Sequence, residues 1–153
     1  MEHVLLLVED DDADAILVAR AIRKAQITVR LERVKNGDEA IDYLDGRAVY
    51  GDRVRYPQPS VVLLDIKLPR RDGFEVVSWL RGQPRPLSRT AVVMFTSSGR
   101  SADINRAYEL GANSYLRKPG QHSDLVEALN AFHDFWLSRC ALPDVGPGAV
   151  HDA

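Results

Sequence analysis

The strongest constraint on the fold is the stretch 61–64, four aliphatic residues that lead directly into Asp65. A continuous apolar run bounded by turn formers, here Pro69 and Gly73, predicts a strand that is buried on both faces of a parallel sheet. Asp65 would then lie at the C-terminal end of this strand. A buried carboxylate is costly unless it is paired or metal-bound. The segment alone therefore leaves two interpretations open: Asp65 caps the next turn, or it faces a site.

Strand and helix patterns alternate along the rest of the chain. The other predicted strands are residues 4–8, 27–34, 91–95 and 114–117. The alternating apolar pattern of 27–34 is typical of a strand near the edge of the sheet. Apolar residues at three- and four-residue spacings predict helices that end near Ala25, Asp45, Arg81, Leu110 and Leu137. Five strands alternating with five helices predict an α/β domain with a parallel sheet and helices on both faces.

The last predicted helix, 123–137, carries a buried stripe of Leu125, Leu129, Phe132 and Trp136. Its neighbouring aromatic residues Phe135 and Trp136 cannot both face the domain's own core, because adjacent helical positions lie about 100° apart. One of them is expected in a partner interface or under the C-terminal tail. The long connection from Gly46 to Pro59 is expected to be helical at its start or to be a surface excursion.

Composition excludes several classes of function. A length of 153 residues, 27% of them charged and 45% apolar, suits one globular domain with a full core. The net charge of -2 gives no basic footprint for nucleic acid. A lone cysteine, Cys140, forms no internal disulfide and is compatible with the cytoplasm. Without a signal-peptide pattern or an apolar run of ~18 residues, we expect a cytoplasmic protein with no membrane partner.

Polar residues follow four of the five predicted strands at the point where each strand ends. They are Glu9 and Asp10 after the first strand, Asp65 after the third, Thr96 after the fourth and Lys118 after the fifth. In open parallel sheets, ligands bind beyond the carboxyl ends of the strands. We therefore expect three carboxylates, one hydroxyl and one ammonium to converge on one edge of the sheet.

Three clustered carboxylates repel one another and need a cation. Oxygen ligands favour a hard divalent ion, and a few carboxylates with retained waters suit Mg²⁺. A Mg²⁺ ion beside a lysine and a threonine hydroxyl would receive a phosphoryl group. The most exposed carboxylate could be the nucleophile and form an aspartyl-phosphate. Asp11, Asp12 and Asp14 are interpreted instead as the acidic N-terminus of the first helix and are left out of the site.

These features resemble the response-regulator receiver domain of two-component signalling, the CheY-like family. The matching elements span nearly the whole chain and keep the family's order: the pair Glu9-Asp10, the block from Asp65 through Leu68-Pro69 to Asp72-Gly73, Thr96, Tyr115 and Lys118-Pro119. The resemblance implies a doubly wound, flavodoxin-like (βα)5 fold with strand order 2-1-3-4-5. It assigns residues 1–138 to the receiver domain and 139–153 to a C-terminal extension associated with a dimer.

The resemblance also implies roles for single residues. Asp65 would accept the phosphoryl group of a sensor histidine kinase. Mg²⁺ would be held by Glu9, Asp10, Asp65 and the backbone carbonyl of Lys67. The chain would not be an enzyme, except that it would catalyse its own Mg²⁺-dependent phosphorylation and dephosphorylation.

The resemblance places the remaining roles on the later strands. Lys118 would pair with the phosphoryl oxygens, and Thr96 would move toward the phosphoryl group. Tyr115 would change its rotamer as Thr96 moves. The Lys118–Pro119 bond would be cis, an option specific to proline.

Three further features resemble the single-domain response regulators that partner bacterial phytochromes. They are the 46–59 connection, the Phe135-Trp136-Leu137 ending of the last helix and the Ala141-Leu142-Pro143 tail. This finer resemblance implies a phytochrome-type histidine kinase, a bacteriophytochrome, as partner. It also implies a homodimer through the face made by the fourth helix, the fifth strand and the fifth helix.

Two other functions are weighed beside phospho-acceptance. One is a dimeric scaffold that acts independently of phosphate. The other is a flavin-binding, flavodoxin-like protein on the same architecture. The second is disfavoured because the four consecutive acids of residues 9–12 would repel a cofactor phosphate where such a protein needs a phosphate loop.

Overall fold

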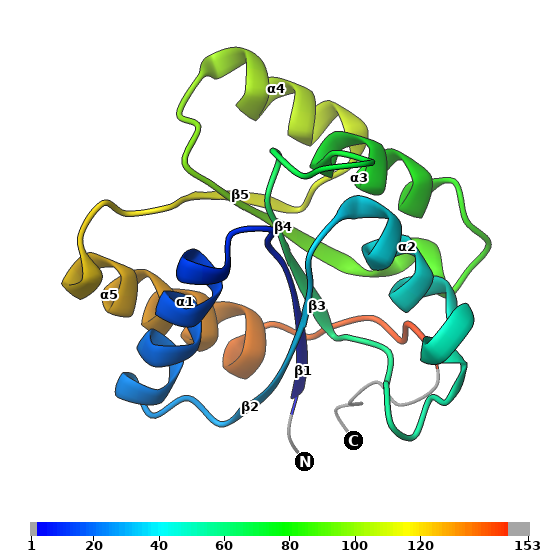
Figure 1. Cartoon of the computed structure of the whole chain (residues 1–153), viewed down its shortest axis with the longest axis horizontal. Helices are drawn as coiled ribbons and strands as arrows, with labels where there is room; N and C mark the ends of the chain where they lie inside the picture. The colour runs from blue at the N-terminus through cyan, green and yellow to red at the C-terminus, as the bar shows by residue number, and fades with distance from the viewer. Residues whose placement is uncertain (1–2, 147–153) are drawn as a thin grey trace.

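The computed structural model describes residues 3–146, and within them one five-stranded parallel sheet forms the centre of the molecule (Figure 1). The strands lie in the order β2-β1-β3-β4-β5. Their bounds are β1 His3–Val8, β2 Val29–Val34, β3 Val61–Leu64, β4 Ala91–Thr96 and β5 Ser114–Arg117. The predicted fold class and the strand order 2-1-3-4-5 are confirmed.

Helices cover both faces of the sheet, as Figure 1 shows. One face carries α1 (Asp12–Lys24) and α5 (His122–Phe132), which pack against each other. The other face carries α2 (Gly37–Asp45), α3 (Gly73–Arg81) and α4 (Ser101–Leu110), packed in that order. A short 3-10 turn, Leu87–Arg89, leads into β4. Among the described residues, no helix is long and apolar enough to cross a membrane.

The three inner strands β1, β3 and β4 are buried along nearly their whole length, as their continuous apolar runs predict. Successive side chains of a strand point to opposite faces, so the strands contribute to two separate cores. Leu6 and Leu64 face the helices α2 to α4, whereas Leu5 and Leu63 face α1 and α5. Strand β2 is half-buried along most of its length and lies at the sheet edge, as predicted.

Local signals set the helix ends close to where the sequence predicts them. Asp11 caps α1, because its side chain accepts a hydrogen bond from the backbone N–H of Asp14 at 3.0 Å. Asp72 caps α3 in the same way through Glu75 N–H at 2.9 Å. Helix α4 ends at Gly111, which adopts the predicted left-handed conformation with φ 106°.

The predicted stripe of the last helix is incomplete at its end, because it leaves out Leu137, which is buried in the same core. After Phe132 the helix widens into a π-helical segment, His133–Arg139, and Cys140 N–H bonds the carbonyl of Phe135, five residues earlier. A π-helix places residues five apart on nearly the same face. Leu137 therefore reaches the core, whereas Trp136 is only half-buried. Phe135 is 56% exposed, so only one of the two aromatic residues packs on the domain, as expected.

The 46–59 connection is an ordered loop with a helical start, the 3-10 turn Ala48–Gly51. Tyr50 and Tyr56 pack on the buried ring of Tyr43, with ring centres 4.9 and 6.1 Å from it. The Tyr43 hydroxyl donates a hydrogen bond to the Pro57 carbonyl at 2.9 Å. The loop thus closes over α2 rather than extending into solvent.

The C-terminal segment passes under the sheet toward the 46–59 loop (Figure 1). Val145 on this segment is 2% exposed, and Leu142 packs against the core that α1 and α5 cover. The first part of the predicted extension is therefore folded onto the domain. Residues 147–153 of that extension lie outside the described residues, so its role in a dimer stays a prediction.

Candidate functional site

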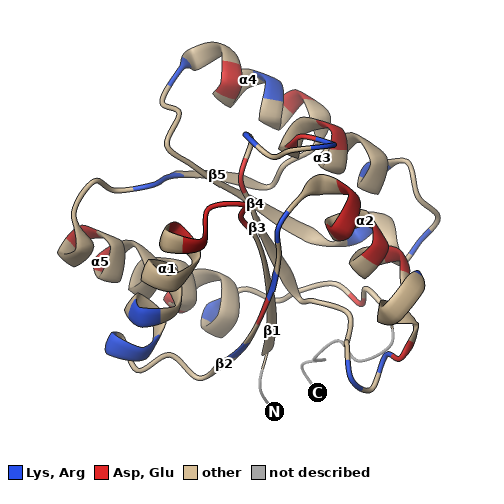
Figure 2. Ribbon diagram, viewed as in Figure 1, with Lys and Arg blue, Asp and Glu red and all other residues tan. Residues whose placement is uncertain are grey.

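The acidic residues at the strand ends gather at one edge of the sheet, as Figure 2 shows for the chain between β1 and α1 and for the end of β3. Glu9, Asp10 and Asp65 each offer a carboxylate oxygen within 4.8 Å of the others. Thr96 ends the neighbouring strand β4, and Lys118 directly follows β5. Parallel strands bring their carboxyl ends to a single edge, so residues far apart in sequence meet here.

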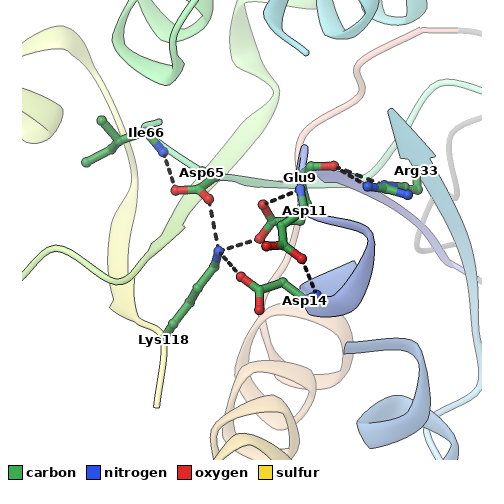
Figure 3. A network of polar contacts seen from close by, with 7 residues as sticks. All are labelled: Glu9, Asp11, Asp14, Arg33, Asp65, Ile66 and Lys118. Carbon is green, nitrogen blue, oxygen red and sulfur yellow. Dashed lines mark hydrogen bonds and ion pairs between the residues drawn. The ribbon is translucent and has the colours of Figure 1, made fainter. Parts of the chain in front are cut away.

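Lys118 joins this cluster through its ammonium group (Figure 3). Its Nζ lies 2.9 Å from Asp65 Oδ2 and also forms an ion pair with Glu9 Oε1. A third ion pair reaches Asp14 Oδ2 at 3.2 Å. The exclusion of Asp14 from the site was therefore wrong, because the first turn of α1 directs its carboxylate back toward Lys118. Asp12 instead pairs with Arg33 and Lys35.

Burial and hydrogen bonds shift the pKa values of Glu9 and Lys118. Glu9 is 1% exposed, and its burial raises its pKa to about 7; the hydrogen bond from Lys118 opposes this, and the charge of Asp65 adds to it. Burial lowers the pKa of Lys118, but its hydrogen bonds to Glu9 and Asp65 outweigh this and raise it above its usual range. Lys118 therefore stays charged at neutral pH.

The backbone around Asp65 holds its carboxylate at the edge of the sheet. Asp65 Oδ1 accepts a hydrogen bond from the next backbone N–H, of Ile66, at 2.7 Å, which leaves Oδ2 to Lys118. Gly73 packs directly behind this turn, and a Cβ atom there would lie 2.2 Å from the Asp65 carbonyl oxygen. This close approach explains the glycine at position 73, because any larger residue there would displace the backbone of Asp65.

Thr96 and Tyr115 lie on the other side of Asp65, on β4 and β5. Thr96 is 2% exposed, and its carbonyl accepts a 2.7 Å hydrogen bond from the backbone N–H of Lys118. Half-buried Tyr115 donates its hydroxyl proton to the Ser98 carbonyl at 2.8 Å. Tyr115 is thus connected to the loop that follows Thr96, and its rotamer change stays a prediction.

One predicted feature of this region is wrong. The cis peptide bond among the described residues is Arg85–Pro86, and the Lys118–Pro119 bond is trans. Trans is the default for an X–Pro bond by ~0.5–1 kcal/mol. Lys67 has an exposed side chain, and its backbone carbonyl as a metal ligand stays a prediction.

Sequence reasoning missed Arg33. This residue of β2 donates from Nε and Nη2 to the backbone carbonyl of Glu9, at 3.0 and 2.8 Å. Its Nη1 bonds Asp12 Oδ1 at 2.8 Å. The available signal was its place near the end of a strand predicted to lie at the sheet edge, but an isolated arginine among charged neighbours does not indicate its partner.

The donor set fits a hard divalent cation. The three convergent ligand groups are carboxylates, the oxygen donors that Mg²⁺ prefers. Asp10 is exposed, so an ion could keep several waters. A buried carboxylate next to a charged lysine, in a cluster whose donors fit a cation, is chemically suited to phosphoryl transfer, since both charges would neutralise a bound phosphoryl group.

Comparisons with known proteins identify the family to which the chain belongs. The model of the response regulator receiver domain family matches residues 5–130. The chain is 35% identical to the response regulator Rcp1 of Synechocystis over 140 residues, which are 92% of each protein. It is 38% identical to a probable methanogenesis regulatory protein, FilR2 of Methanothrix harundinacea, over 88% of this chain and 83% of that protein.

Solved structures show the same similarity. The response regulator RPA3017 in red light signaling of R. palustris superposes with a TM-score of 0.88 at 35% identity, over 93% of this chain and 99% of that one. The phosphorylated cyanobacterial phytochrome response regulator RcpA gives 0.86 at 32% identity, over 94% and 100%. The Mn²⁺-bound form of Rcp1 gives 0.82 at 34% identity, over 93% and 99%.

Proposed function

We propose, for a chain that belongs to the response regulator receiver domain family, that Asp65 is the acceptor of a phosphoryl group from a histidine kinase. The observation that carries the proposal is the contact of Asp65 Oδ2 with Lys118 Nζ at 2.9 Å, inside a cluster of three carboxylates. The family and its relation to phytochrome response regulators are shown by the comparisons. The residue roles that follow are proposals.

The proposed reaction uses the Asp65 oxygen that contacts Lys118 and not the backbone. Asp65 Oδ1 is held by the backbone of Ile66, so Oδ2 is the oxygen that attacks the phosphorus of a phosphohistidine. The new O–P bond forms as the N–P bond to the imidazole breaks. Lys118 then exchanges its contact with Asp65 for a phosphoryl oxygen, and the Thr96 hydroxyl bonds a second one.

Glu9, Asp10, Asp65 and the backbone carbonyl of Lys67 would hold Mg²⁺. When bound, this ion neutralises part of the negative charge on the phosphoryl oxygens. The Mn²⁺-bound structure of the relative Rcp1 supports a divalent ion in this family. The proximity of the three carboxylate oxygens supports these residues as its ligands in this chain.

The proposed output is a change in protein partners. Phosphorylation would draw Thr96 toward the phosphoryl group, and Tyr115 would follow through the loop that it bonds. An apolar groove of about 470 Å³ lies beside Tyr115, between β5 and α5, and Phe135 and Trp136 line it. This groove supports the homodimer that we propose through α4, β5 and α5. A phytochrome-type kinase is the proposed phosphate source, because several relatives are phytochrome response regulators.

Labelling with a small phosphodonor tests the acceptor. The full chain, incubated with acetyl phosphate and Mg²⁺, should gain one phosphoryl group by mass spectrometry. Asp65→Asn should gain none, while Asp38→Asn, which removes an exposed carboxylate paired with Arg70 and Arg71, should label like the wild type. Labelling of Asp65→Asn at the wild-type level would refute the assignment.

The groove also favours a second candidate, a dimeric scaffold that needs no phosphate. Sedimentation of the full chain with and without a beryllofluoride phosphoryl mimic separates the two candidates. Tighter dimerisation with the mimic supports the phosphate switch. An equal dimer affinity in both conditions supports the scaffold.

A further inference from the structure

Arg33 contacts the acidic side of the site from the edge strand β2. It is paired in register with Leu7 of β1, so its side chain reaches past the end of that strand. Three of its guanidinium N–H groups donate hydrogen bonds: two to the Glu9 carbonyl and one to the Asp12 carboxylate. Figure 3 shows Glu9 between this guanidinium and the ammonium of Lys118.

These contacts hold the backbone at Glu9 and Asp10, the two acids that follow β1. The backbone N–H of Glu9 already donates to the Val34 carbonyl of β2 at 3.1 Å. The Glu9 carbonyl, which belongs to the peptide bond between Glu9 and Asp10, is held by Arg33. Strand β2 therefore holds both polar groups of the Glu9 backbone, one by its main chain and one by a side chain.

The third hydrogen bond ties the same guanidinium to the first residue of α1. Asp12 begins that helix, so the planar guanidinium spans the connection from β1 to α1. Free rotation of the 9–10 peptide would turn the Asp10 side chain relative to Glu9 and Asp65. Holding the peptide preserves the arrangement in which the three carboxylate oxygens lie within 4.8 Å.

We propose that Arg33 is a positioning residue that presets Glu9 and Asp10 for a divalent cation. The inference rests on the proposed metal site and deepens it. Groups that orient metal ligands typically contribute ten- to a hundredfold to metal affinity. The expected loss on removing Arg33 is therefore at least tenfold.

The direction of the change in metal affinity distinguishes a positioning role of Arg33 from an electrostatic one. A guanidinium next to an acidic cluster repels a cation, so a purely electrostatic role predicts tighter metal binding when Arg33 is neutralised. A positioning role predicts weaker binding. Lys35 offers a matched control, because its ammonium lies 3.6 Å from the same Asp12 carboxylate but does not hold the Glu9 carbonyl.

The experiment measures Mn²⁺ binding to the full chain by electron paramagnetic resonance, with Mg²⁺ as competitor, for wild type, Arg33→Gln, Arg33→Lys and Lys35→Gln. We expect Arg33→Gln to weaken both metals at least tenfold, and Lys35→Gln to leave binding unchanged or slightly tighter. Arg33→Lys keeps the charge but loses the planar donor pair, so it should also bind more weakly than wild type. Circular dichroism monitors folding, and if Arg33→Gln does not fold, Arg33→Lys decides.

Each other outcome overturns a specific statement. Wild-type affinity or tighter binding in a folded Arg33→Gln, or in Arg33→Lys where only that variant folds, overturns the positioning role and leaves the metal site intact. An equal loss in Lys35→Gln would show that the loss does not depend on the hydrogen bonds to the Glu9 carbonyl, and it overturns the positioning role as well. A wild type that binds neither metal overturns the proposed metal site, and this inference with it.

Discussion

The two sides of the site differ in the hydrogen bonds that hold them. The acidic side, residues 9–12, is fixed by β2 at both backbone groups of Glu9 and at the carboxylate of Asp12. On the opposite side, a backbone hydrogen bond of 2.7 Å ties Lys118 to the Thr96 carbonyl. The loop that follows Thr96, residues 97–99, is held by side-chain hydrogen bonds: Tyr115 to the Ser98 carbonyl at 2.8 Å, the Ser98 hydroxyl to Asp103 at 2.6 Å and the exposed Arg117 Nε to the Ser97 carbonyl at 3.3 Å. From this comparison we predict that the acidic side is preorganised for a cation and that the loop 97–99 is the part that moves.

Lys118 joins the two sides, and its removal should have the largest effect. Lys118→Met would leave the buried carboxylates of Glu9 and Asp65 without their cation. Breaking a buried ion pair in this way costs ~3 kcal/mol or more. Urea denaturation in EDTA should show this loss in the free energy of unfolding, and saturating Mg²⁺ should restore part of it.

The control for this variant is Lys35→Met, which removes an ammonium from an exposed pair with Asp12. Exposed pairs contribute ~0–1 kcal/mol, so this variant should unfold near the wild-type midpoint. If the two variants were equally stable, the cluster around Lys118 would contribute no more than a surface ion pair, and it would not link the two sides.

The acidic side should respond to pH through Glu9. Its pKa of about 7 lies above its ordinary value, so Glu9 is mostly ionised at pH 8 and mostly protonated at pH 6. A protonated carboxylate does not bind a metal. Mg²⁺ affinity, measured by the same competition with Mn²⁺, should therefore fall ~tenfold from pH 8 to pH 6, since each pH unit below the pKa lowers the ionised fraction about tenfold. A flat profile over this range would show that Glu9 is already ionised at pH 6.

The buried strands could be predicted from the sequence because their apolar runs have one physical solution. Because residues 61–64 have no polar side chain, their strand must lie inside the sheet. Asp65 then lies at the carboxyl end of that strand. The convergence of Glu9, Asp65 and Lys118 follows in turn from the parallel arrangement of the strands. The convergence of these three residues was therefore predictable from the positions at which the strands end.

The misses share a different cause. The contact of Asp14 with Lys118, the three bonds of Arg33 and the burial of Leu137 all depend on side-chain direction or helix pitch at one position. The burial of Leu137 requires the wider π-helical turn, which changes which residues share a face. Periodicity assumes a constant pitch, and it says nothing of where a long arginine side chain ends.

Tyr115→Phe tests how firmly the loop 97–99 is held. It removes the hydroxyl bond to Ser98 but keeps the ring in its place against the core. A single neutral hydrogen bond contributes ~1 kcal/mol, so stability should fall by that amount or less. Hydrogen exchange should become faster at residues 97–99 and stay unchanged at residues 9–12. Tyr108→Phe, at an exposed position on α4, should change neither segment.

The smallest predicted effect concerns Asp14, whose side chain is 44% exposed. Asp14 competes with an incoming phosphoryl group for Lys118, so Asp14→Asn should lengthen the lifetime of phosphorylated Asp65. A half-exposed pair contributes ~1 kcal/mol at most, which limits the change to about fivefold. The lifetime is measured by the loss of label after acetyl phosphate is removed. Asp38→Asn, which removes a carboxylate paired with Arg70 and Arg71 away from the site, should not lengthen it. A lifetime that shortens in Asp14→Asn would mean that Asp14 holds Lys118 in place for the phosphoryl group instead of competing with it, and the fixed side of the site would then extend from β1 into the first turn of α1.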